Sequence, residues 1–131
     1  MTDRILAVGA VVRDDDGRFL LVQRGREPQA GLWSVPGGKV EPPETLPQAV
    51  IREIGEETGI EVEVGREVWA LDIPDGRGAI FEVHDFVAVA CTTDVVAGDD
   101  AADAGWFSPE EMRALPLTPG LVEHLLRHGL L

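Results

Sequence analysis

The sequence has little cysteine, few basic residues and no long apolar run. Cys91 is the only cysteine among the 131 residues, so no internal disulfide can form and nothing indicates an oxidising compartment. No apolar run reaches the ~18 residues that a membrane-spanning helix needs. Residues 1–5 also lack the charged and apolar regions of a signal peptide. We therefore expect a cytoplasmic protein that does not contact a membrane.

Basic residues are outnumbered by acidic ones. The chain has 11 Lys and Arg against 24 Asp and Glu, a formal net charge of −13. Surfaces that bind duplex nucleic acid or anionic lipid need basic patches, so we expect neither partner. A phosphate-bearing substrate would bind only where local cations or a bound metal reverse the field. Most of the acids are interpreted as solubilising surface charge.

Apolar residues make up 44% of the chain, which is enough to form a core. A chain of this length fits one domain, and no internal repeat, low-complexity tract or linker divides it. We expect a single domain over residues 1–131.

The first part of the sequence has a strand–turn–strand pattern. Residues 5–13 are a β-rich apolar run, and residues 14–17 end in the Asp-Gly pair that is typical of hairpins. Residues 19–24 are the expected returning strand, and residues 25–38 have the composition of a loop.

The rest of the chain predicts a helix, two strands and two further helices, over residues 45–58, 61–66, 79–92, about 108–115 and 118–129. The strands come in clusters rather than in strict alternation with helices. This order predicts the α/β (α+β) class, with helices packed on a mixed sheet. The second strand is expected to be central because its middle is continuously apolar, and Cys91 is expected in the core.

The helix over residues 45–58 has clear start and stop residues. Thr45 and Gln48 form a capping box, and Pro47 falls in the first turn, where its missing N–H does no harm. Gly59 follows the last residue and favours a helix end.

One face of this helix changes character along its length. At 100° per residue, Leu46, Val50 and Ile54 form an apolar stripe. Glu53 and Glu57 fall on the same stripe, so a face that begins apolar becomes acidic in its last two turns.

The acidic end of the helix is electrostatically costly. Glu53 is an i,i+3 neighbour of Glu56 and an i,i+4 neighbour of Glu57, and two carboxylates ~5 Å apart repel by about 3 kcal/mol at an effective dielectric of about 20. A solvated acidic helix end is one interpretation. The other is a site for a hard divalent ion, Mg²⁺ or Mn²⁺. The flexible pair Gly37-Gly38 nearby, together with Arg52, favours the second interpretation.

The spacing of these residues resembles a known motif. Gly38 is followed after five residues by Glu44, and after seven more by residues 52–60, Arg-Glu-Ile-Gly-Glu-Glu-Thr-Gly-Ile. This is similar to the Nudix box at every defined position. Residues 31–38 resemble the family's lead-in to the box, and residues 98–107 resemble its later acidic loop and Trp-containing strand.

The resemblance to the Nudix (MutT-like) hydrolases implies an α/β/α sandwich with a central mixed β-sheet. It implies Mg²⁺- or Mn²⁺-dependent hydrolysis of the diphosphate linkage in a nucleoside diphosphate derivative, with ADP-ribose or a nucleotide sugar as the expected substrate. The alternatives are a (d)NTP pyrophosphohydrolase of the nucleotide-pool sanitising type and a non-catalytic nucleotide sensor. Sensors usually lose box glutamates, and none is missing here. Dimers are common among similar proteins, so a homodimer is possible.

The resemblance also assigns roles to residues. The catalytic set is Arg52, Glu53, Glu56 and Glu57. The metal ligands are Glu53, Glu56, Glu57, Asp100 and the backbone carbonyl of Gly37. Asp99 is the second choice for the acid of the later loop. Arg52 would orient Glu53. Glu44 would either lie behind the metal ligands or bind a secondary metal ion, and Gly38 would lie behind the ligands.

Three cations lie close to the box in the sequence, and three aromatic residues are candidates for stacking on a base. Arg24, Arg26 and Lys39 are the candidates for phosphate contact, and ordinary surface bases are the alternative for each. The aromatic residues are Trp33, Trp69 and Phe81. Core packing is the favoured interpretation for these three.

Overall fold

The computed structural model describes residues 3–27 and 29–131. Met1 and Thr2, at the start of the expected domain, and Pro28, in the expected loop, lie outside the described residues. Among the helices that are described, none is both long and apolar enough to cross a membrane.

Four long strands form the centre of a seven-stranded sheet. They are β1 (Asp3–Arg13), β2 (Phe19–Arg24), β5 (Val62–Pro74) and β6 (Ala79–Ala90), and the sheet order is β3-β2-β1-β6-β5. β1 and β6 run parallel over their whole length, whereas β5 runs antiparallel to β6. The sheet is therefore mixed, and β6 is an inner strand as predicted.

Three further strands complete the sheet. They are β3 (Trp33–Ser34), β4 (Gly37–Lys39) and β7 (Ala101–Phe107). β4 pairs with β1, while β3 and β7 pair with β2. β3 and β4 lie inside residues 25–38 and just beyond them, so the prediction of a continuous loop there was wrong. These two short segments are extended because they pair with β1 and β2, and no local sequence pattern indicates that pairing.

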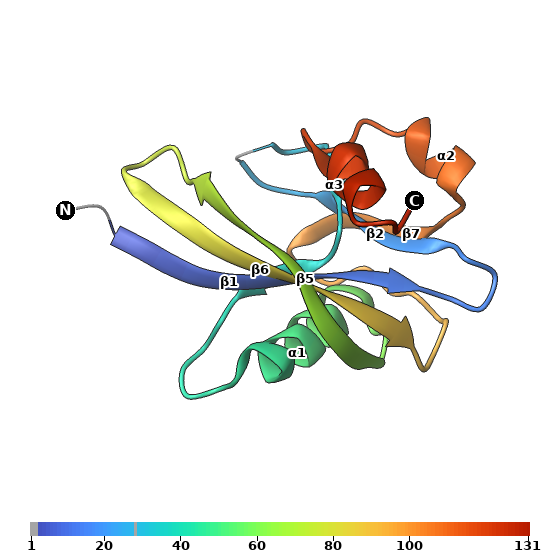
Figure 1. Cartoon of the computed structure of the whole chain (residues 1–131), viewed down its shortest axis with the longest axis horizontal. Helices are drawn as coiled ribbons and strands as arrows, with labels where there is room; N and C mark the ends of the chain where they lie inside the picture. The colour runs from blue at the N-terminus through green and yellow to red at the C-terminus, as the bar shows by residue number, and fades with distance from the viewer. Residues whose placement is uncertain (1–2, 28) are drawn as a thin grey trace.

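Helices cover both faces of the sheet (Figure 1). α1 (Leu46–Thr58) packs on one face, and α2 (Pro109–Arg113) and α3 (Leu121–Arg127) pack on the other. Each face has its own apolar core, with Val50 and Ile54 in the first and Met112 and Leu125 in the second. This layered arrangement confirms the predicted fold class.

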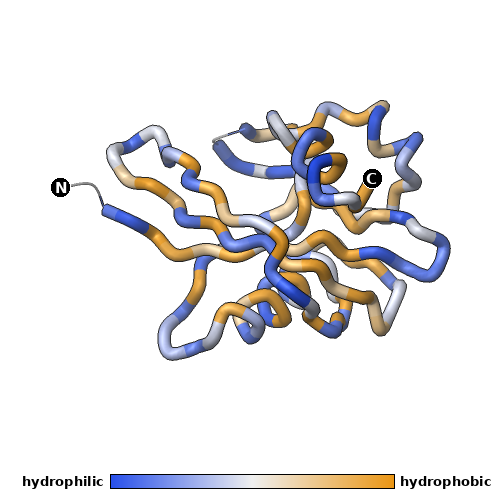
Figure 2. The backbone as a smooth tube through the Cα atoms, in the orientation of Figure 1, coloured by the Kyte–Doolittle hydropathy of each residue, from blue (hydrophilic) through white to orange (hydrophobic). Residues whose placement is uncertain are grey.

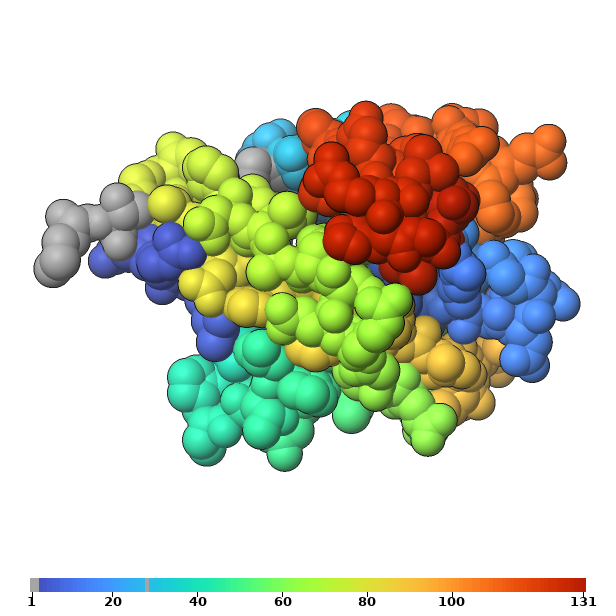
Figure 3. Space-filling view, in the orientation of Figure 1, coloured from blue at the N-terminus to red at the C-terminus, as the bar shows by residue number. Residues whose placement is uncertain are grey.

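Apolar and polar residues are distributed as a layered fold requires. In Figure 2 the hydrophobic segments follow the middle of the strands, and the hydrophilic ones gather at turns and ends. Figure 3 shows the atoms of α3 beside those of β5 on the same face. The contact is a stack of Trp69 in β5 on His124 and His128, with ring centroids 5.4 and 5.0 Å apart.

The α1 helix begins and ends as its sequence predicts. The Thr45 hydroxyl accepts from the N–H of Gln48, and the Gln48 side chain accepts from the N–H of Thr45. At the other end Gly59 adopts a left-handed conformation, with φ of 72°. Both caps satisfy backbone groups that a helix end leaves open.

β5 is much longer than the predicted strand over residues 61–66. It continues to Pro74 by pairing with β6, and register shifts around Glu67 absorb the irregular segment. A turn at residues 75–78 then joins the two strands, with the N–H of Arg77 and of Ala79 donating to the Asp75 carboxylate. The hairpin partner supplies the extended conformation that the sequence pattern did not indicate.

Two further predictions near the ends of elements were wrong. α3 begins at Leu121 rather than at Thr118, because Gly120 has φ of 85° and Thr118 instead donates its N–H to the Trp33 carbonyl. Cys91 is exposed rather than in the core, since β6 ends at the residue before it.

Candidate active site

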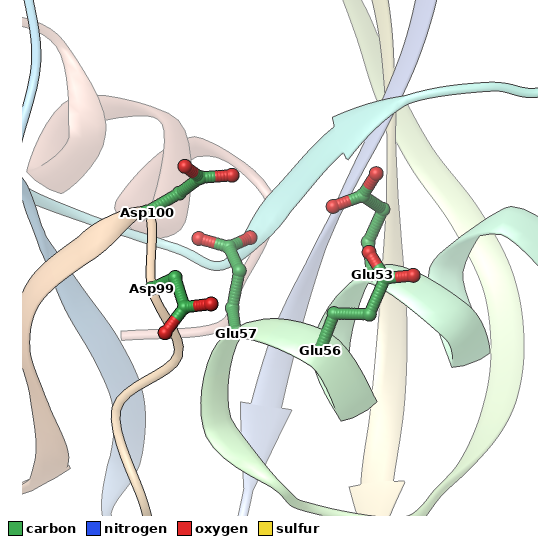
Figure 4. Close-up of a pocket in the computed structure, with 5 residues that line it drawn as sticks. All are labelled: Glu53, Glu56, Glu57, Asp99 and Asp100. Atoms are coloured by element: carbon green, nitrogen blue, oxygen red, sulfur yellow. The ribbon is translucent and has the colours of Figure 1, made fainter.

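Five carboxylates line one cavity of about 280 Å³. They are Glu53, Glu56 and Glu57 from α1 and Asp99 and Asp100 from the segment that leads into β7. Figure 4 shows the acids of α1 and those of the loop facing one another across this space. Two segments separated by some forty positions in the sequence therefore meet at one acidic site.

Arg52 is held by a network of hydrogen bonds behind the acids. Its guanidinium donates to Glu53 at 2.9 Å, to Glu56 at 3.2 Å and to Glu44 at 2.6 Å. It also donates to the backbone carbonyl of Lys39 at 2.9 Å. Arg52 thus joins the loop before α1 to the acidic end of the helix and orients Glu53. The hydrogen bonds from Arg52 hold the pKa of Glu44 below its ordinary value.

Glu53 lies against the chain where Gly38 has no side chain. A Cβ at Gly38 would overlap the Glu53 carboxylate, so a larger residue at this position would displace that carboxylate. The Glu53 side chain is 15% exposed. Burial raises its pKa, Arg52 opposes that rise, and the charge of Glu56 adds to it. Glu53 is therefore a carboxylate whose charge costs free energy without a cation nearby.

Glu57 is the most perturbed acid of the cavity. Its carboxylate accepts a hydrogen bond of 2.8 Å from the N–H of Gly37. Burial raises the pKa of Glu57 to about 7, and the charges of Glu53 and Asp100 act in the same direction. The Gly37 N–H and the Arg24 guanidinium lower it, without cancelling the rise. Near neutral pH this group is easily protonated.

The predicted cations lie at different places around the site. Arg24 is half-buried and close enough to act on Glu57. Arg26 forms an exposed ion pair of 3.0 Å with Asp100. The Lys39 side chain is exposed at the end of β4, and its backbone carbonyl accepts from Arg52. Arg26 therefore contacts an acid of the cavity directly, and Arg24 acts on one through its charge.

The predicted aromatic residues belong to the fold rather than to the acidic cavity. Trp33 is 7% exposed and packs edge-to-face on Phe107 at 5.0 Å. Trp69 packs under α3, and Phe81 is partly buried in β6. None of the three lines the acidic cavity.

Asp85, a buried acid in β6, was not among the predicted site residues. Asp85 is 5% exposed and lies over Gly9, where a Cβ would overlap its carboxylate. Burial raises the pKa of Asp85 to about 6. The indole N–H of Trp69 lowers this pKa but lies outside hydrogen-bond geometry. The available indication was an acid directly before the apolar run of residues 86–90.

The composition of the cavity fits a hard divalent cation. Its donors are oxygens, and burial and mutual repulsion raise the pKa of both Glu53 and Glu57. A cation among them would relieve both effects. Among the described residues, no three acidic, histidine or cysteine side chains already surround one point. The site is therefore an acid-lined cavity rather than a preformed cage.

The NUDIX domain family matches residues 3–127. The chain belongs to the Nudix family. This Nudix chain is 39% identical over 117 residues to the CTP pyrophosphohydrolase of Escherichia coli (strain K12), covering 88% of the chain and 85% of that relative. It is 36% identical over 104 residues to the ADP-ribose pyrophosphatase of Methanocaldococcus jannaschii, covering 78% and 60% of the two chains.

A solved structure supports the same family. The MutT NUDIX hydrolase from Burkholderia pseudomallei matches this Nudix chain with a TM-score of 0.81 at 33% identity, over 95% of the chain and 97% of the other. The protein is thus a MutT-like Nudix hydrolase, an enzyme that acts on phosphoanhydride bonds. Hydrolases of this family generally use divalent metal ions.

Proposed function

We propose that this Nudix hydrolase is a Mg²⁺- or Mn²⁺-dependent pyrophosphohydrolase that cleaves the diphosphate linkage of a nucleotide substrate. The observation that carries the proposal is the cavity lined by five carboxylates, with Arg26 paired to Asp100 and the charge of Arg24 acting on Glu57. An acidic protein binds a polyanion only where cations reverse the local field. Metal ions on the acids, together with these two arginines, would provide that reversal.

The first candidate substrate is a nucleoside diphosphate derivative such as ADP-ribose or a nucleotide sugar. Residues 98–107 and 115–120 together resemble small bacterial family members of the ADP-ribose pyrophosphatase type, which favours this class. The relative from Methanocaldococcus jannaschii, which is an ADP-ribose pyrophosphatase, supports it.

The second candidate is a nucleoside triphosphate, from which hydrolysis would release a monophosphate and diphosphate. The observation that favours it is the 39% identity with a CTP pyrophosphohydrolase, which extends over 85% of that relative. Both candidates use the same bond type and the same acids.

The acids of the cavity would bind the metal ions and accept a proton. Glu53, Glu56, Glu57 and Asp100 would hold the metal ions, and the Gly37 carbonyl is a further candidate ligand. Bound there, the ions would neutralise the diphosphate and promote deprotonation of the attacking water. Glu53, held by Arg52, is the candidate acceptor of that proton.

The positive groups would orient the substrate. Arg26 pairs with Asp100 and the charge of Arg24 acts on Glu57, and both side chains would donate to the phosphate oxygens. Lys39 is exposed and would add charge at the rim of the site. In this proposal Arg26 leaves Asp100 when substrate enters, because the pair is exposed and therefore weak.

A hydrolysis panel tests the proposal. The purified protein is incubated with ADP-ribose, a nucleotide sugar, CTP, the oxidised guanine triphosphate and a dinucleoside polyphosphate, each with Mg²⁺, with Mn²⁺ or with a chelator. We expect turnover of one substrate class, abolished by the chelator. Binding of nucleotides without any turnover would instead favour a nucleotide sensor and overturn the proposal.

A further inference from the structure

The loop that carries Asp99 and Asp100 is fastened to the end of α1 by backbone hydrogen bonds. The N–H of Gly98 donates to the carbonyl of Glu57 at 2.8 Å, and the N–H of Val96 donates to the carbonyl of Thr58 at 2.9 Å. The last carbonyls of a helix have no donor within the helix. The loop therefore caps the same helix end that carries the box glutamates.

The same loop is fastened at its beginning. The indole N–H of Trp106 in β7 donates to the carbonyl of Thr93 at 3.0 Å. Val95 packs against the core under α1. Because both sides of the segment are held, the two acids that follow it have little freedom to move relative to α1.

Gly98 is the point of closest approach between the loop and the helix. A Cβ at Gly98 would overlap the carbonyl oxygen of Glu56 and would lie 3.2 Å from the Cα of Glu57. Both partners are helix backbone, which cannot rotate away as a side chain would. Only glycine lets the chain pass at this distance, and the next two residues are Asp99 and Asp100.

Gly25 lies close to the backbone on the other side of the acid pair, but with more space than Gly98 has. A Cβ there would lie 3.1 Å from the Asp100 carbonyl and 3.3 Å from the N–H nitrogen of Ala102. These contacts are close but not overlapping. The backbone at Asp100 thus passes close to Gly25, the residue after β2, while Gly98 precedes Asp100 at the end of α1.

We infer that Gly98 is a positioning residue: by docking on the α1 carbonyls it sets where Asp99 and Asp100 stand relative to Glu57. The inference rests on the proposed function, since it assumes that the loop acids and the box glutamates act on one metal-bound substrate. Gly98 contributes no ligand itself. Its role is to fix the relative positions of two groups of ligands that come from distant parts of the chain.

Three glycine-to-alanine variants make a graded test. Gly55→Ala is the matched control, because a Cβ at Gly55 meets nothing within 4 Å. Binding of Mn²⁺ is measured by calorimetry, and kcat and KM are measured on the best substrate. We expect wild-type Mn²⁺ affinity for Gly55→Ala, a small loss for Gly25→Ala and a loss of about 10–100-fold for Gly98→Ala, the range seen when groups that orient metal ligands are removed.

A double-mutant cycle separates positioning from general damage. Asp99→Asn and Asp100→Asn are introduced together into the wild type and into Gly98→Ala. We expect the acid pair to cost Mn²⁺ affinity in the wild type and much less in Gly98→Ala, where the acids are already displaced. A merely structural role for Gly98 would lower the melting temperature and leave the full effect of the acid pair in place.

The outcomes distinguish the inference from the proposed function. No Mn²⁺ binding and no turnover by the wild type would sink the proposed function. A wild type that binds Mn²⁺ while folded Gly98→Ala binds it equally well would overturn the inference alone, as would an acid-pair variant with unchanged affinity. If Gly98→Ala does not fold, the comparison of Gly25→Ala with Gly55→Ala decides, and equal Mn²⁺ affinity of those two variants contradicts the inference.

Discussion

The raised pKa values of Glu53 and Glu57 depend on the residues that bury them. In the helix alone they are ordinary acids on one face, and the sequence predicted that face correctly. Their raised pKa values come from burial and from facing charges, including Asp100 for Glu57. The hydrogen bond from Gly37 to Glu57 depends on the pairing of β4 with β1, which the sequence did not indicate.

Replacing Glu53 by Gln tests its role directly. The change keeps the volume of the side chain and its hydrogen-bonding capacity toward Arg52 but removes the charge and the proton acceptor. We expect kcat to fall by about 10²–10⁴-fold, the range typical of a removed general base, while the melting temperature stays at or above the wild-type value. Glu63→Gln is the control because Glu63 is an exposed acid of β5. Near-normal turnover by Glu53→Gln would remove Glu53 from the assigned role.

Asp85 predicts a pH dependence of stability. Its pKa rises from an ordinary 3.8 to about 6 because the residue is buried, so the folded state binds its proton more tightly than the unfolded state does. The stabilisation is full below about pH 4 and is lost as pH rises through about 6. The total is about 3 kcal/mol at 1.36 kcal/mol per pH unit, of which about 2 kcal/mol falls between about pH 4.5 and pH 7.5.

The measurement is urea unfolding of the wild type and of Asp85→Asn at those two pH values. We expect the variant to gain about 2 kcal/mol relative to the wild type on going from the lower to the higher pH. Of the groups near Asp85, Glu67 raises its pKa and His84 lowers it, and both remain in the variant. Asp15→Asn, at an exposed hairpin position, is the control and should follow the wild type. Parallel profiles for wild type and Asp85→Asn would contradict the prediction.

The α1 helix shows how far an element can be predicted from local sequence. Its start at Thr45, its end at Gly59 and its buried residues follow from capping chemistry and from a period of 3.6. All of this information lies within fifteen consecutive positions. β5 is the contrary case, because its second half is extended only through its pairing with β6.

The cap of α1 provides a prediction at the scale of the element. Thr45→Ala removes the hydroxyl that accepts from the N–H of Gln48, and we expect a loss of about 1 kcal/mol in the free energy of unfolding. Urea denaturation measures it. Thr45→Ser keeps a hydroxyl at the cap and should recover most of the loss. An unchanged midpoint for Thr45→Ala would show that the cap does not stabilise the protein.

The net charge of −13 acts on the whole molecule. Like charges destabilise a compact state, and in the acid-lined cavity neighbouring acids raise the pKa of both Glu53 and Glu57. A cation that binds there stabilises the folded form by mass action, since the unfolded chain does not assemble the acids.

We therefore expect Mn²⁺ to raise the melting temperature of the wild type. At a hundred times the dissociation constant the gain is about 2.7 kcal/mol, which corresponds to a shift of several degrees for a protein of this size. Differential scanning fluorimetry measures the shift against NaCl of the same ionic strength. The gain should shrink in Glu57→Gln. Equal shifts from Mn²⁺ and NaCl would mean that screening alone, rather than binding at the cavity, is responsible.

Several properties of the whole molecule stay predictions. These are the single domain over residues 1–131, the cytoplasmic location, the absence of nucleic-acid and membrane partners and the possible homodimer. The fold class and the enzyme family are confirmed by the layered architecture and by the family match over residues 3–127.

The sequence by itself determined the Nudix box, the helix that carries it and the side of that helix on which the acids stand, because each depends on neighbours within a few turns. It also indicated Asp99 and Asp100 through their resemblance to a known loop. Only the tertiary structure decided that the loop docks on the end of α1 through Gly98, that Gly37 donates to Glu57, and that Asp85 is buried over Gly9. Those contacts join segments far apart in the chain, and local patterns cannot encode which distant backbone will pass close enough to exclude a Cβ.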